Sequence, residues 1–527
     1  MNTMKKLITL TVFALMAATL YSCTDLDESL NSGFNENFTP SNPGFGESVN
    51  VNLPTPNDGL SAAYSTLFNG SANHGSYFSV SEISTDEVVI TQKGGDWFDG
   101  GIWLNMHRHD FRSTNPGLNG SWNDNYGGIT QTNELLASGN LDANQTAQLR
   151  TLRAYYYWRL MDMFGRIKII TSPGQDSPQV DRPAVFEFVV NELQAALPDL
   201  NMTAGYSRIT SGVANALLAR VFLNGEVYTR PYPYSPGTGQ TTWDGTSMWQ
   251  HTINYADAVI NSGMYELDTD FESLFGPANI QSPEHIFIVP FDEATGPNMN
   301  FGQMTFHYPS QLTYDFAEQP WNGYSSLEAF YNLYDANDAR KDAFFVEGPQ
   351  TDLNGNPILD VAFDEDDPDG APINYTPAIN ELAPNGSRQA GVRMGKFSHK
   401  VGQLSNMDND YTLLRYADVL LMKAEAVARE NANWSHPTTL MLVNMVRARA
   451  GLGDVNQLTA STFEDERAKE MFQESIRRTD QIRFNSWGEA WWEKAAHSND
   501  YKNIMPIPLD QINATTDGSL TQHPDYS

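Results

Sequence analysis

The sequence predicts a mostly α-helical protein, in which tetratricopeptide-like helical hairpins form a scaffold with a loop-rich, partly β insert. In several blocks of the first half and again near the end, apolar residues recur every three to four positions, as in amphipathic helices. Residues 266–405 lack this spacing and are rich in Gly, Pro and Asp. A chain of 527 residues, 40% of them apolar, can bury a core of this kind.

The clearest helical hairpin is predicted over Tyr411–Leu452. Its first half places one apolar set at helical spacing, namely Leu414, Ala417, Leu421, Ala424 and Ala428. Its second half carries a similar set, namely Leu440, Val443, Met445, Val446 and Ala450. Gly451 provides a stop, and the polar stretch Glu430–Trp434 joins the two helices. Because one hairpin cannot bury its apolar face alone, we expect neighbouring helices from the rest of the chain.

Further helices are predicted from the same spacing, at Asn57–Leu67, Gly127–Leu136, Ala143–Phe164, Pro183–Leu197, Arg208–Tyr228, Gln250–Ser262 and Phe463–Arg483. The third of these has clear boundaries, since Asp142 is a capping residue and Gly165 ends the pattern. Within the insert, Asn354-Gly355 predicts a hairpin turn, and His285–Phe291 is a short apolar run.

The N-terminus has the features of a bacterial lipoprotein signal. Lys5 and Lys6 precede the apolar stretch Leu7–Leu20, which is too short to cross a bilayer, and Cys23 follows it. We therefore expect residues 1–22 to be a signal peptide, Cys23 to be the acylated residue, and residues 23–55 to be a flexible tether. A secretory signal without a lipid is the alternative. Because Cys23 is the only cysteine, disulfides and catalytic thiols are excluded.

The charge balance excludes some classes of partner. The chain has 32 Lys and Arg against 64 Asp and Glu, a net charge of −32, so the basic surface of a nucleic-acid-binding protein is not expected. Neutral ligands suit this charge better than strongly anionic ones. The sequence contains no HExxH, Walker or GxSxG motif, and no single carboxylate pair stands out as that of a glycosidase. We therefore expect no enzymatic activity.

Nine sequence blocks, taken in order behind the predicted lipobox, resemble the SusD/RagB family of surface glycan-binding lipoproteins. They are Arg153–Ile170, Ile209–Leu223, Tyr255–Leu267, Ser282–Phe291, Leu413–Ala426, Val443–Leu452, Glu466–Phe484, Ile504–Ile512 and Leu520–Tyr526. The resemblance implies an N-terminal SusD-like helical region over 56–265, a loop-rich insert over 266–405 and a C-terminal SusD/RagB helical region over 406–527. It also implies a scaffold of four tetratricopeptide-like hairpins.

The resemblance further implies a location on the outer membrane, facing the cell exterior. Members of this family sit over a SusC-like, TonB-dependent transporter, with the tetratricopeptide side toward that barrel. The acidic residues Asp25–Glu28 resemble the surface-export signal of such lipoproteins.

Two loops have the composition of a glycan site, which uses flat aromatic rings flanked by amides and carboxylates. One is Gly94–Trp103, with Asp96 and Trp97, and the other is Pro320–Tyr324, with Trp321 and Asn322. The expected ligand-binding residues are Trp97, Trp321, Asp96, Asn322, Tyr308 and Tyr324. For each tryptophan the alternative is a loop packed on the scaffold. Core packing is expected for Trp103, Trp122 and Trp158, and a structural role for Trp491 and Trp492.

No cofactor is expected. His107 and His109 would share one face of a strand and could bind a metal there, but no third ligand is evident nearby, so polar packing is favoured. The acidic run Asp364–Asp367 could hold calcium, yet it does not fit the EF-hand spacing and is interpreted as a solvated loop.

The sequence thus predicts a non-catalytic, lipid-anchored protein that captures a polysaccharide or oligosaccharide, preferably a neutral glucan, and delivers it to a SusC-like transporter. One alternative is a surface glycoside hydrolase. The other is a protein-binding tetratricopeptide-type assembly subunit, in which Trp97 and Trp321 would be buried.

Overall fold

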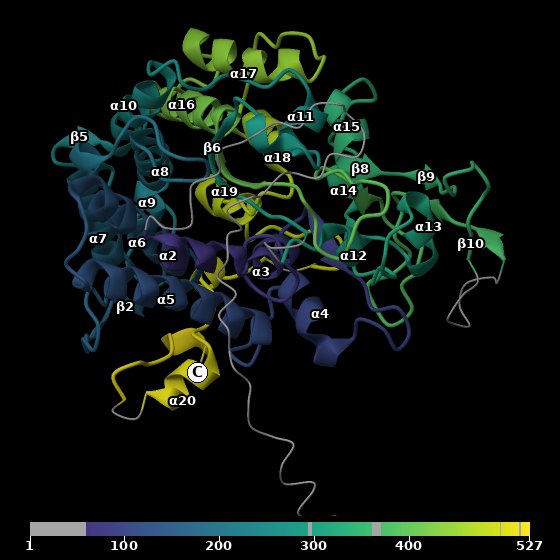
Figure 1. Ribbon diagram of the computed structural model, residues 1–527, viewed down its shortest axis with the longest axis horizontal. Coiled ribbons are helices and arrows are strands. Elements are labelled where there is room, and N and C mark those ends of the chain that lie inside the picture. The colour runs from purple at the N-terminus through teal and green to yellow at the C-terminus, as the bar shows by residue number, and fades with distance from the viewer. Residues whose placement is uncertain (1–58, 294–297, 361–369, 496, 516–517, 527) are drawn as a thin grey trace, which may run out of the picture. The chain divides into compact units, whose positions relative to one another are not determined.

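The computed structural model of the chain describes residues 59–293, 298–360, 370–495, 497–515 and 518–526 (Figure 1). The predicted signal peptide, Cys23 with its tether, and the acidic run Asp364–Asp367 lie outside the described residues. Within the described part, no helix is long and apolar enough to cross a membrane.

Two long helices, α5 (Pro116–Ala137) and α6 (Ala143–Phe164), pack against each other as one hairpin. Asp142 and Gln145 form a capping box at the start of α6, and Gly165 ends it at a φ of 68°, as the sequence predicts. A Cβ atom on Gly128 would lie 2.4 Å from the ring of Tyr156, so glycine is needed where these helices meet. Helix α5 begins earlier than predicted because Asn115 caps its first turn.

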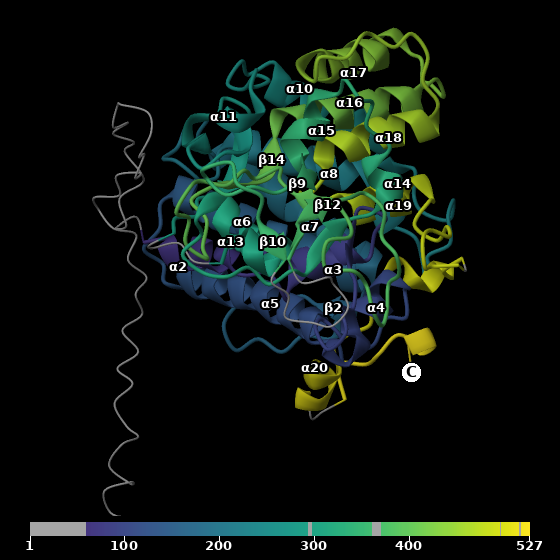
Figure 2. The same cartoon turned by 90° about the vertical axis from the view of Figure 1, so that its right-hand side faces the viewer.

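The remaining long helices continue this arrangement, and they are α7 (Arg182–Ala196), α8 (Ser211–Leu223), α10 (Met248–Ile260), α16 (Tyr416–Glu430) and α17 (Pro437–Arg449). Helix α6 packs on α7, α8 on α10, α10 on α16, and α16 on α17. Figure 2 shows α16 and α17 side by side with α18 (Ala460–Met471). This succession confirms the predicted scaffold of helical hairpins and joins helices from both sides of the insert.

The prediction for the first helix of the Tyr411–Leu452 hairpin is wrong at its start. Tyr411–Arg415 is strand β14, which pairs antiparallel with β6 (His285–Val289). Leu414 is therefore buried in a strand, where its long-range partner outweighs its helical spacing. In α17, Met445 is 41% exposed and does not join the apolar face.

Two predicted single helices are each divided in two. Arg208–Tyr228 forms α8 and the short α9 (Gly225–Tyr228), which meet at Asn224. Phe463–Arg483 forms α18 and α19 (Arg477–Phe484), separated by a turn in which Gln473 and Ser475 have positive φ. The predicted first helix consists of α2 (Ser61–Ser65) and the 3₁₀ turn η1 (Thr66–Phe68).

The strands pair two by two, all antiparallel. The pairs that lie in or reach the insert, besides β6 with β14, are β1 (Val88–Ile90) with β7 (Tyr324–Ser326), β8 (Phe345–Val346) with β13 (Arg393–Met394), β9 (Gly348–Pro349) with β12 (Asn374–Tyr375), and β10 (Leu359–Asp360) with β11 (Ala371–Pro372). The others are β2 (Ile167–Lys168) with β3 (Gln179–Val180) and β4 (Thr242–Trp243) with β5 (Thr246–Ser247). The predicted turn at Asn354-Gly355 is confirmed, since Gly355 has a φ of 81° and Thr351 pairs with Pro357 across it.

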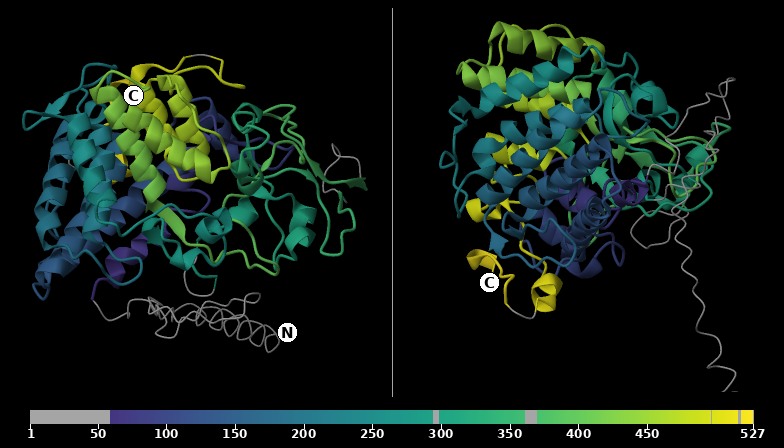
Figure 3. Two further views of the ribbon diagram at one scale, coloured as in Figure 1. Left: turned by 90° about the horizontal axis from the view of Figure 1, so that it is seen from above. Right: turned by 60° about the vertical axis from the view of Figure 1, so that its left-hand side comes forward.

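Short helices complete the described chain, namely α3 (Tyr77–Ile83), α4 (Ile102–His107), α11 (Phe271–Phe275), α12 (Phe301–Thr305), α13 (Gln311–Tyr314), α14 (Glu328–Tyr331), α15 (Ala339–Phe344) and α20 (Leu509–Ala514). Figure 3 shows the insert elements on the side of the molecule away from α5, α6 and α7.

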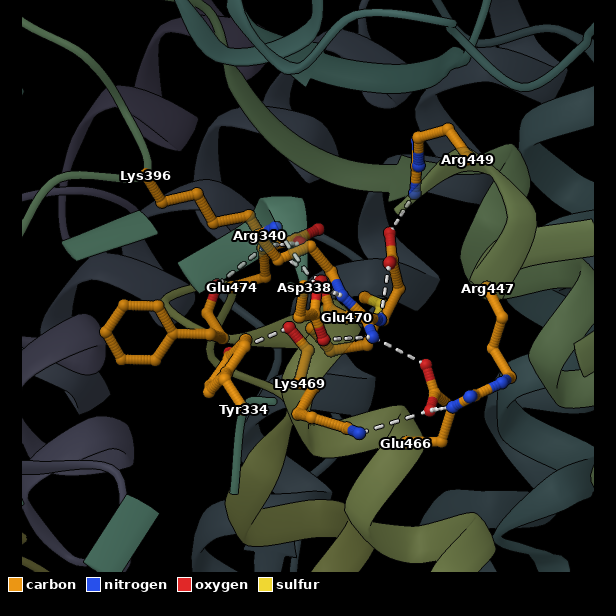
Figure 4. A network of polar contacts seen from close by, with 12 residues as sticks. Tyr334, Asp338, Arg340, Lys396, Arg447, Arg449, Glu466, Lys469, Glu470 and Glu474 are labelled. Atoms are coloured by element: carbon orange, nitrogen blue, oxygen red, sulfur yellow. Dashed lines mark hydrogen bonds and ion pairs between the residues drawn. The ribbon is translucent and has the colours of Figure 1, made fainter. Parts of the chain in front are cut away.

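A buried network of ion pairs ties the insert to the C-terminal helices (Figure 4). Arg415 is fully buried and contacts the carboxylates of Glu284 at 2.8 Å, Glu470 at 2.7 Å and Glu474 at 2.7 Å. Arg340 of α15 reaches Glu470 at 3.2 Å, and Arg449 binds the same carboxylate. Several of the few basic residues of this acidic chain therefore form ion pairs inside the fold.

Candidate functional site

The two loops predicted to bind a ligand lie against each other. Strand β1 pairs with β7, with Ile90 opposite Tyr324, and so brings the loop after β1 to the loop before β7. The indole Nε1 of Trp97 donates a hydrogen bond of 2.7 Å to the backbone carbonyl of Trp321. The Nζ of the buried Lys93 donates to the carbonyls of Thr91 and Gly323, at 3.2 and 3.3 Å. The structure therefore assembles one site from both stretches.

Local backbone geometry explains which residue types form this contact. Trp97 has a φ of 60° and Asn322 a φ of 56°, so each loop turns sharply at the site. A Cβ atom on Gly323 would lie 2.5 Å from the Trp97 ring. Glycine is required there because any side chain would occupy the space of the indole.

An aromatic cluster forms around His74, in the loop before α3. Its ring centroid lies 5.2 Å from that of Trp97, 5.0 Å from Trp103 and 6.2 Å from Trp321. The Tyr324 ring lies 5.8 Å away, and its hydroxyl is 2.8 Å from His74 Nδ1. The contacts with Trp97, Trp321 and Tyr324 are edge-on, an arrangement that aromatic pairs prefer, and the contact with Trp103 is tilted.

Part of this cluster is open to solvent. Trp321 is 37% exposed and Trp97 is half-buried, and Phe98, which follows Trp97 in the sequence, is 48% exposed. Aromatic rings that are partly open to solvent offer a large contact surface to a ligand. Trp321 is the most exposed of the predicted aromatic site residues.

Three polar side chains converge beside these rings. Tyr308 donates a hydrogen bond to Asp96 Oδ2, and Arg388 Nη1 lies 2.9 Å from both that oxygen and the Tyr308 hydroxyl. Burial opposes ionisation of Asp96, but the hydrogen bonds from Tyr308 and Arg388 outweigh it and hold the pKa of Asp96 below its ordinary value. Burial and the adjacent Asp96 raise the pKa of Tyr308 to about 12. The Asp96 side chain is 46% exposed and so presents a fixed carboxylate to solvent.

Asn322 and Tyr324 lie below this surface and are fully buried. The Asn322 amide is 3.0 Å from His307 Nδ1, and His307 Nε2 is 3.1 Å from Asp360 of β10. The Tyr324 hydroxyl contacts Ser79 at 2.7 Å. In this structure both side chains therefore support the loops from beneath.

The other tryptophans take the predicted packing positions. Trp103, Trp122 and Trp158 are buried, and Trp103 Nε1 donates to Asp99 at 2.8 Å. Trp491 and Trp492 are half-buried and pack on His107.

The two histidines of the His-Arg-His stretch do not share a strand face. His107 ends helix α4, and His109 follows it with a φ of 55°. His107 Nε2 is 2.8 Å from the Trp492 carbonyl, and His109 contacts Ser84 and Ser498. Burial lowers the pKa of His107 to about 4. Polar packing is therefore confirmed for both, and the described residues contain no group of three or more metal-ligating side chains.

Sequence reasoning missed four residues of the site, namely His74, Lys93, His307 and Arg388. Each has at least one partner that is distant in sequence, such as Asp96 for Arg388, 292 residues away, and Gly323 for Lys93, 230 residues away. Spacing within a loop carries no signal for such pairs. The pairing of β1 with β7 brings the Lys93 segment to Gly323, and the pairing of β8 with β13 helps to place the segment that carries Arg388.

Comparison with known proteins identifies relatives of this chain. Residues 283–526 match the model of the SusD family. A starch-binding protein SusD of Bacteroides thetaiotaomicron is 26% identical in an alignment of 435 residues that covers 73% of this chain and 74% of the relative.

Solved structures share the fold. A laminarin-binding SusD-like protein has a TM-score of 0.67 and 22% identity, over 89% of this chain and 98% of the other. A surface glycan-binding protein A from Bacteroides thetaiotaomicron, in complex with laminarihexaose, has a TM-score of 0.68 and 20% identity, over 88% of this chain and 98% of the other.

Proposed function

This chain belongs to the SusD family, and from that premise we propose that it captures a polysaccharide or oligosaccharide at the cell surface through the Trp97–Trp321 site. Proteins of this family are non-catalytic binding proteins associated with the outer membrane at the cell surface. The exposed face of Trp321 stacks on the apolar face of a sugar ring. The Asp96 carboxylate, held by Arg388 and Tyr308, accepts hydrogen bonds from sugar hydroxyls.

The observation that carries this proposal is the Trp97 Nε1 to Trp321 carbonyl hydrogen bond of 2.7 Å, which joins the two aromatic loops while Trp321 stays 37% exposed. A protein-binding assembly subunit without a sugar site would bury both indoles. The half-buried Trp97 and the exposed Trp321 argue against that alternative. Preorganised aromatic rings lose little freedom on binding, which favours affinity for a flexible glycan.

The proposed ligand is a neutral glucan, and the acidic chain supports this choice. The named relatives bind starch or laminarin, so a starch-like α-glucan and a β-glucan are the first polymers to test. The proposed mechanism involves no cofactor.

The captured glycan passes to a SusC-like, TonB-dependent transporter in the outer membrane. A lipid on Cys23 anchors the protein there, facing the cell exterior. Cys23 directly follows the apolar stretch of the predicted signal peptide, and this pattern supports the anchor. Modest affinity suits such a role, because the glycan must leave again for the transporter.

Native affinity electrophoresis tests the capture step. The soluble chain beginning at Thr24 is run in gels that contain starch, laminarin or an acidic polysaccharide, beside Trp321→Ala and Trp97→Ala. Trp249→Ala, which alters a half-buried tryptophan of α10, is the matched control. Retardation by one polymer that is lost in Trp321→Ala and kept in Trp249→Ala supports the proposal. If the polymer becomes shorter during incubation, the protein is a hydrolase. If no polymer retards the unchanged chain, glycan capture is contradicted.

A further inference from the structure

His74 occupies the middle of the aromatic cluster, and its role follows from the hydrogen bonds of its two ring nitrogens. We propose that His74 is a further ligand-contacting residue, whose Nε2–H donates a hydrogen bond to a sugar hydroxyl between the Trp97 and Trp321 rings. This inference rests on the proposed glycan-binding function. It adds a specific donor to a site in which the exposed Asp96 carboxylate is an acceptor.

The hydrogen bonds beneath His74 fix its tautomer. Ser79 Oγ accepts a hydrogen bond of 2.8 Å from the Gly75 backbone N–H and lies 2.7 Å from the Tyr324 hydroxyl, which lies 2.8 Å from His74 Nδ1. If Ser79 donates to Tyr324 and Tyr324 donates to His74, both buried hydroxyl hydrogens have acceptors. In the opposite direction, no described residue is seen to accept the hydrogen of Ser79. Nδ1 is therefore the acceptor, and the proton of the neutral ring is on Nε2.

The Nε2 nitrogen is available to a ligand. Within the described part of the chain no hydrogen bond reaches it, and it is not among the buried nitrogen and oxygen atoms that lack a partner, so it keeps contact with solvent. The ring itself is neither fully buried nor exposed. Its plane stands at 84° to that of Trp97 and at 64° to that of Trp321, with ring centroids 5.2 and 6.2 Å away, so the imidazole contacts both indoles edge-on.

The surroundings keep the imidazole neutral. Burial lowers the pKa of His74 to about 4 and outweighs the raising effect of the nearby Asp99 carboxylate. The other titratable group that faces the ring is the Tyr324 hydroxyl, whose pKa is raised by burial and which stays protonated. At neutral pH His74 thus presents one N–H donor and no charge, which suits an uncharged hydroxyl.

Imidazole ¹⁵N NMR of the chain beginning at Thr24 tests the tautomer directly. We expect the His74 signals to show a protonated Nε2 and an unprotonated Nδ1 from pH 6 to pH 8. Titration with laminarihexaose or maltoheptaose, whichever matches the retarding polymer, should shift the Nε2 signal more than the Nδ1 signal. A protonated Nδ1, or an Nε2 signal that does not respond to a bound sugar, overturns the inference.

Affinity gels containing starch or laminarin supply the second measurement. His74→Phe keeps an aromatic ring but removes both nitrogens, and we expect about fivefold to tenfold weaker retention, as for one lost hydrogen bond. His74→Gln, which restores an N–H donor, should recover part of that loss, whereas a purely structural role would leave Gln no better than Phe. Full retention of His74→Phe together with loss of Trp321→Ala overturns this inference and leaves the proposed function standing. If the unchanged chain is retained by no polymer, the proposed function fails and this inference fails with it.

Discussion

Trp97 and Trp321, which are 224 residues apart, are joined by a hydrogen bond from the indole Nε1 of the first to the backbone carbonyl of the second. Through this contact the half-buried indole of Trp97 holds the loop that carries the exposed Trp321. One ring therefore positions the other, and the two tryptophans are expected to respond differently to substitution.

Replacing Trp97 by Phe should weaken glycan binding by roughly threefold to tenfold, because it removes the Nε1–H that holds the Trp321 loop while keeping an aromatic ring. Trp321→Phe keeps a stacking face and its backbone carbonyl, so we expect a smaller loss. Retention in polysaccharide gels measures both. Equal losses in the two variants would contradict the positioning role of Trp97.

Gly323→Ala should disrupt the same contact by crowding. The added Cβ would lie 2.5 Å from the Trp97 ring, and overpacking of this kind costs about 1–3 kcal/mol. We expect a lower thermal midpoint and loss of glycan retention. Gly95→Ala is the control, because it lies in the same region, has no heavy atom within 4 Å of the new Cβ and does not have a positive φ. A Gly323→Ala variant as stable and as well retained as Gly95→Ala would refute this account.

Much of the fold could be predicted from the sequence, because helices such as α6 carry their caps and their apolar spacing locally. The strand Tyr411–Arg415 could not, since its partner β6 lies more than a hundred residues earlier and only tertiary pairing distinguishes it from a helix start. The exposed aromatic loops were recognisable by composition. Their partners His74 and Arg388 were not, because those residues reach the loops through tertiary contacts that the composition of the loops does not indicate.

Arg415→Met should strongly destabilise the fold. The change removes the guanidinium that three buried carboxylates share, those of Glu284, Glu470 and Glu474. Removing one partner of a buried ion pair costs about 3–5 kcal/mol. Denaturant unfolding measures the loss. Lys423→Met is the control, since it removes the half-buried pair with Asp257 and should cost about 1 kcal/mol or less. Similar losses in the two variants would mean that the buried network adds no special stability.

Acid should weaken the fold through two buried carboxylates. Burial opposes the ionisation of Asp418, but Arg467 and Arg220 outweigh it and lower the pKa of Asp418 to about 2. Burial likewise opposes the ionisation of Glu425, and Arg483 and Arg429 lower its pKa to about 2. A carboxylate whose pKa is lower in the folded state stabilises the fold above the ordinary pKa near 4, and this stabilisation is lost as pH falls toward 2. The free energy of unfolding should therefore decrease between about pH 5 and pH 2.

Asp418→Asn tests that assignment. The variant should be less stable than the unchanged chain at pH 7 but should lose less stability on acidification, because one titrating group has been removed. Denaturant unfolding at several pH values gives, for each of the two proteins, the slope of the free energy of unfolding against pH. Parallel slopes would show that Asp418 does not contribute to acid sensitivity.

Asp410 should have the opposite pH dependence. Its carboxyl group is buried beside the Tyr206 hydroxyl, and burial, together with the nearby Asp408 and Asp292, raises its pKa to about 8 although the Tyr206 hydrogen bond opposes this. A carboxyl whose pKa is higher in the folded state costs no stability below its ordinary pKa near 4, and the cost grows as pH rises toward 8. Asp410→Asn keeps the shape and removes the charge, so it should stabilise the fold on the order of 1–3 kcal/mol at pH 8 and little at pH 4. Thermal unfolding at the two pH values measures this difference. A gain of the same size at both would mean that titration of Asp410 is not its cause.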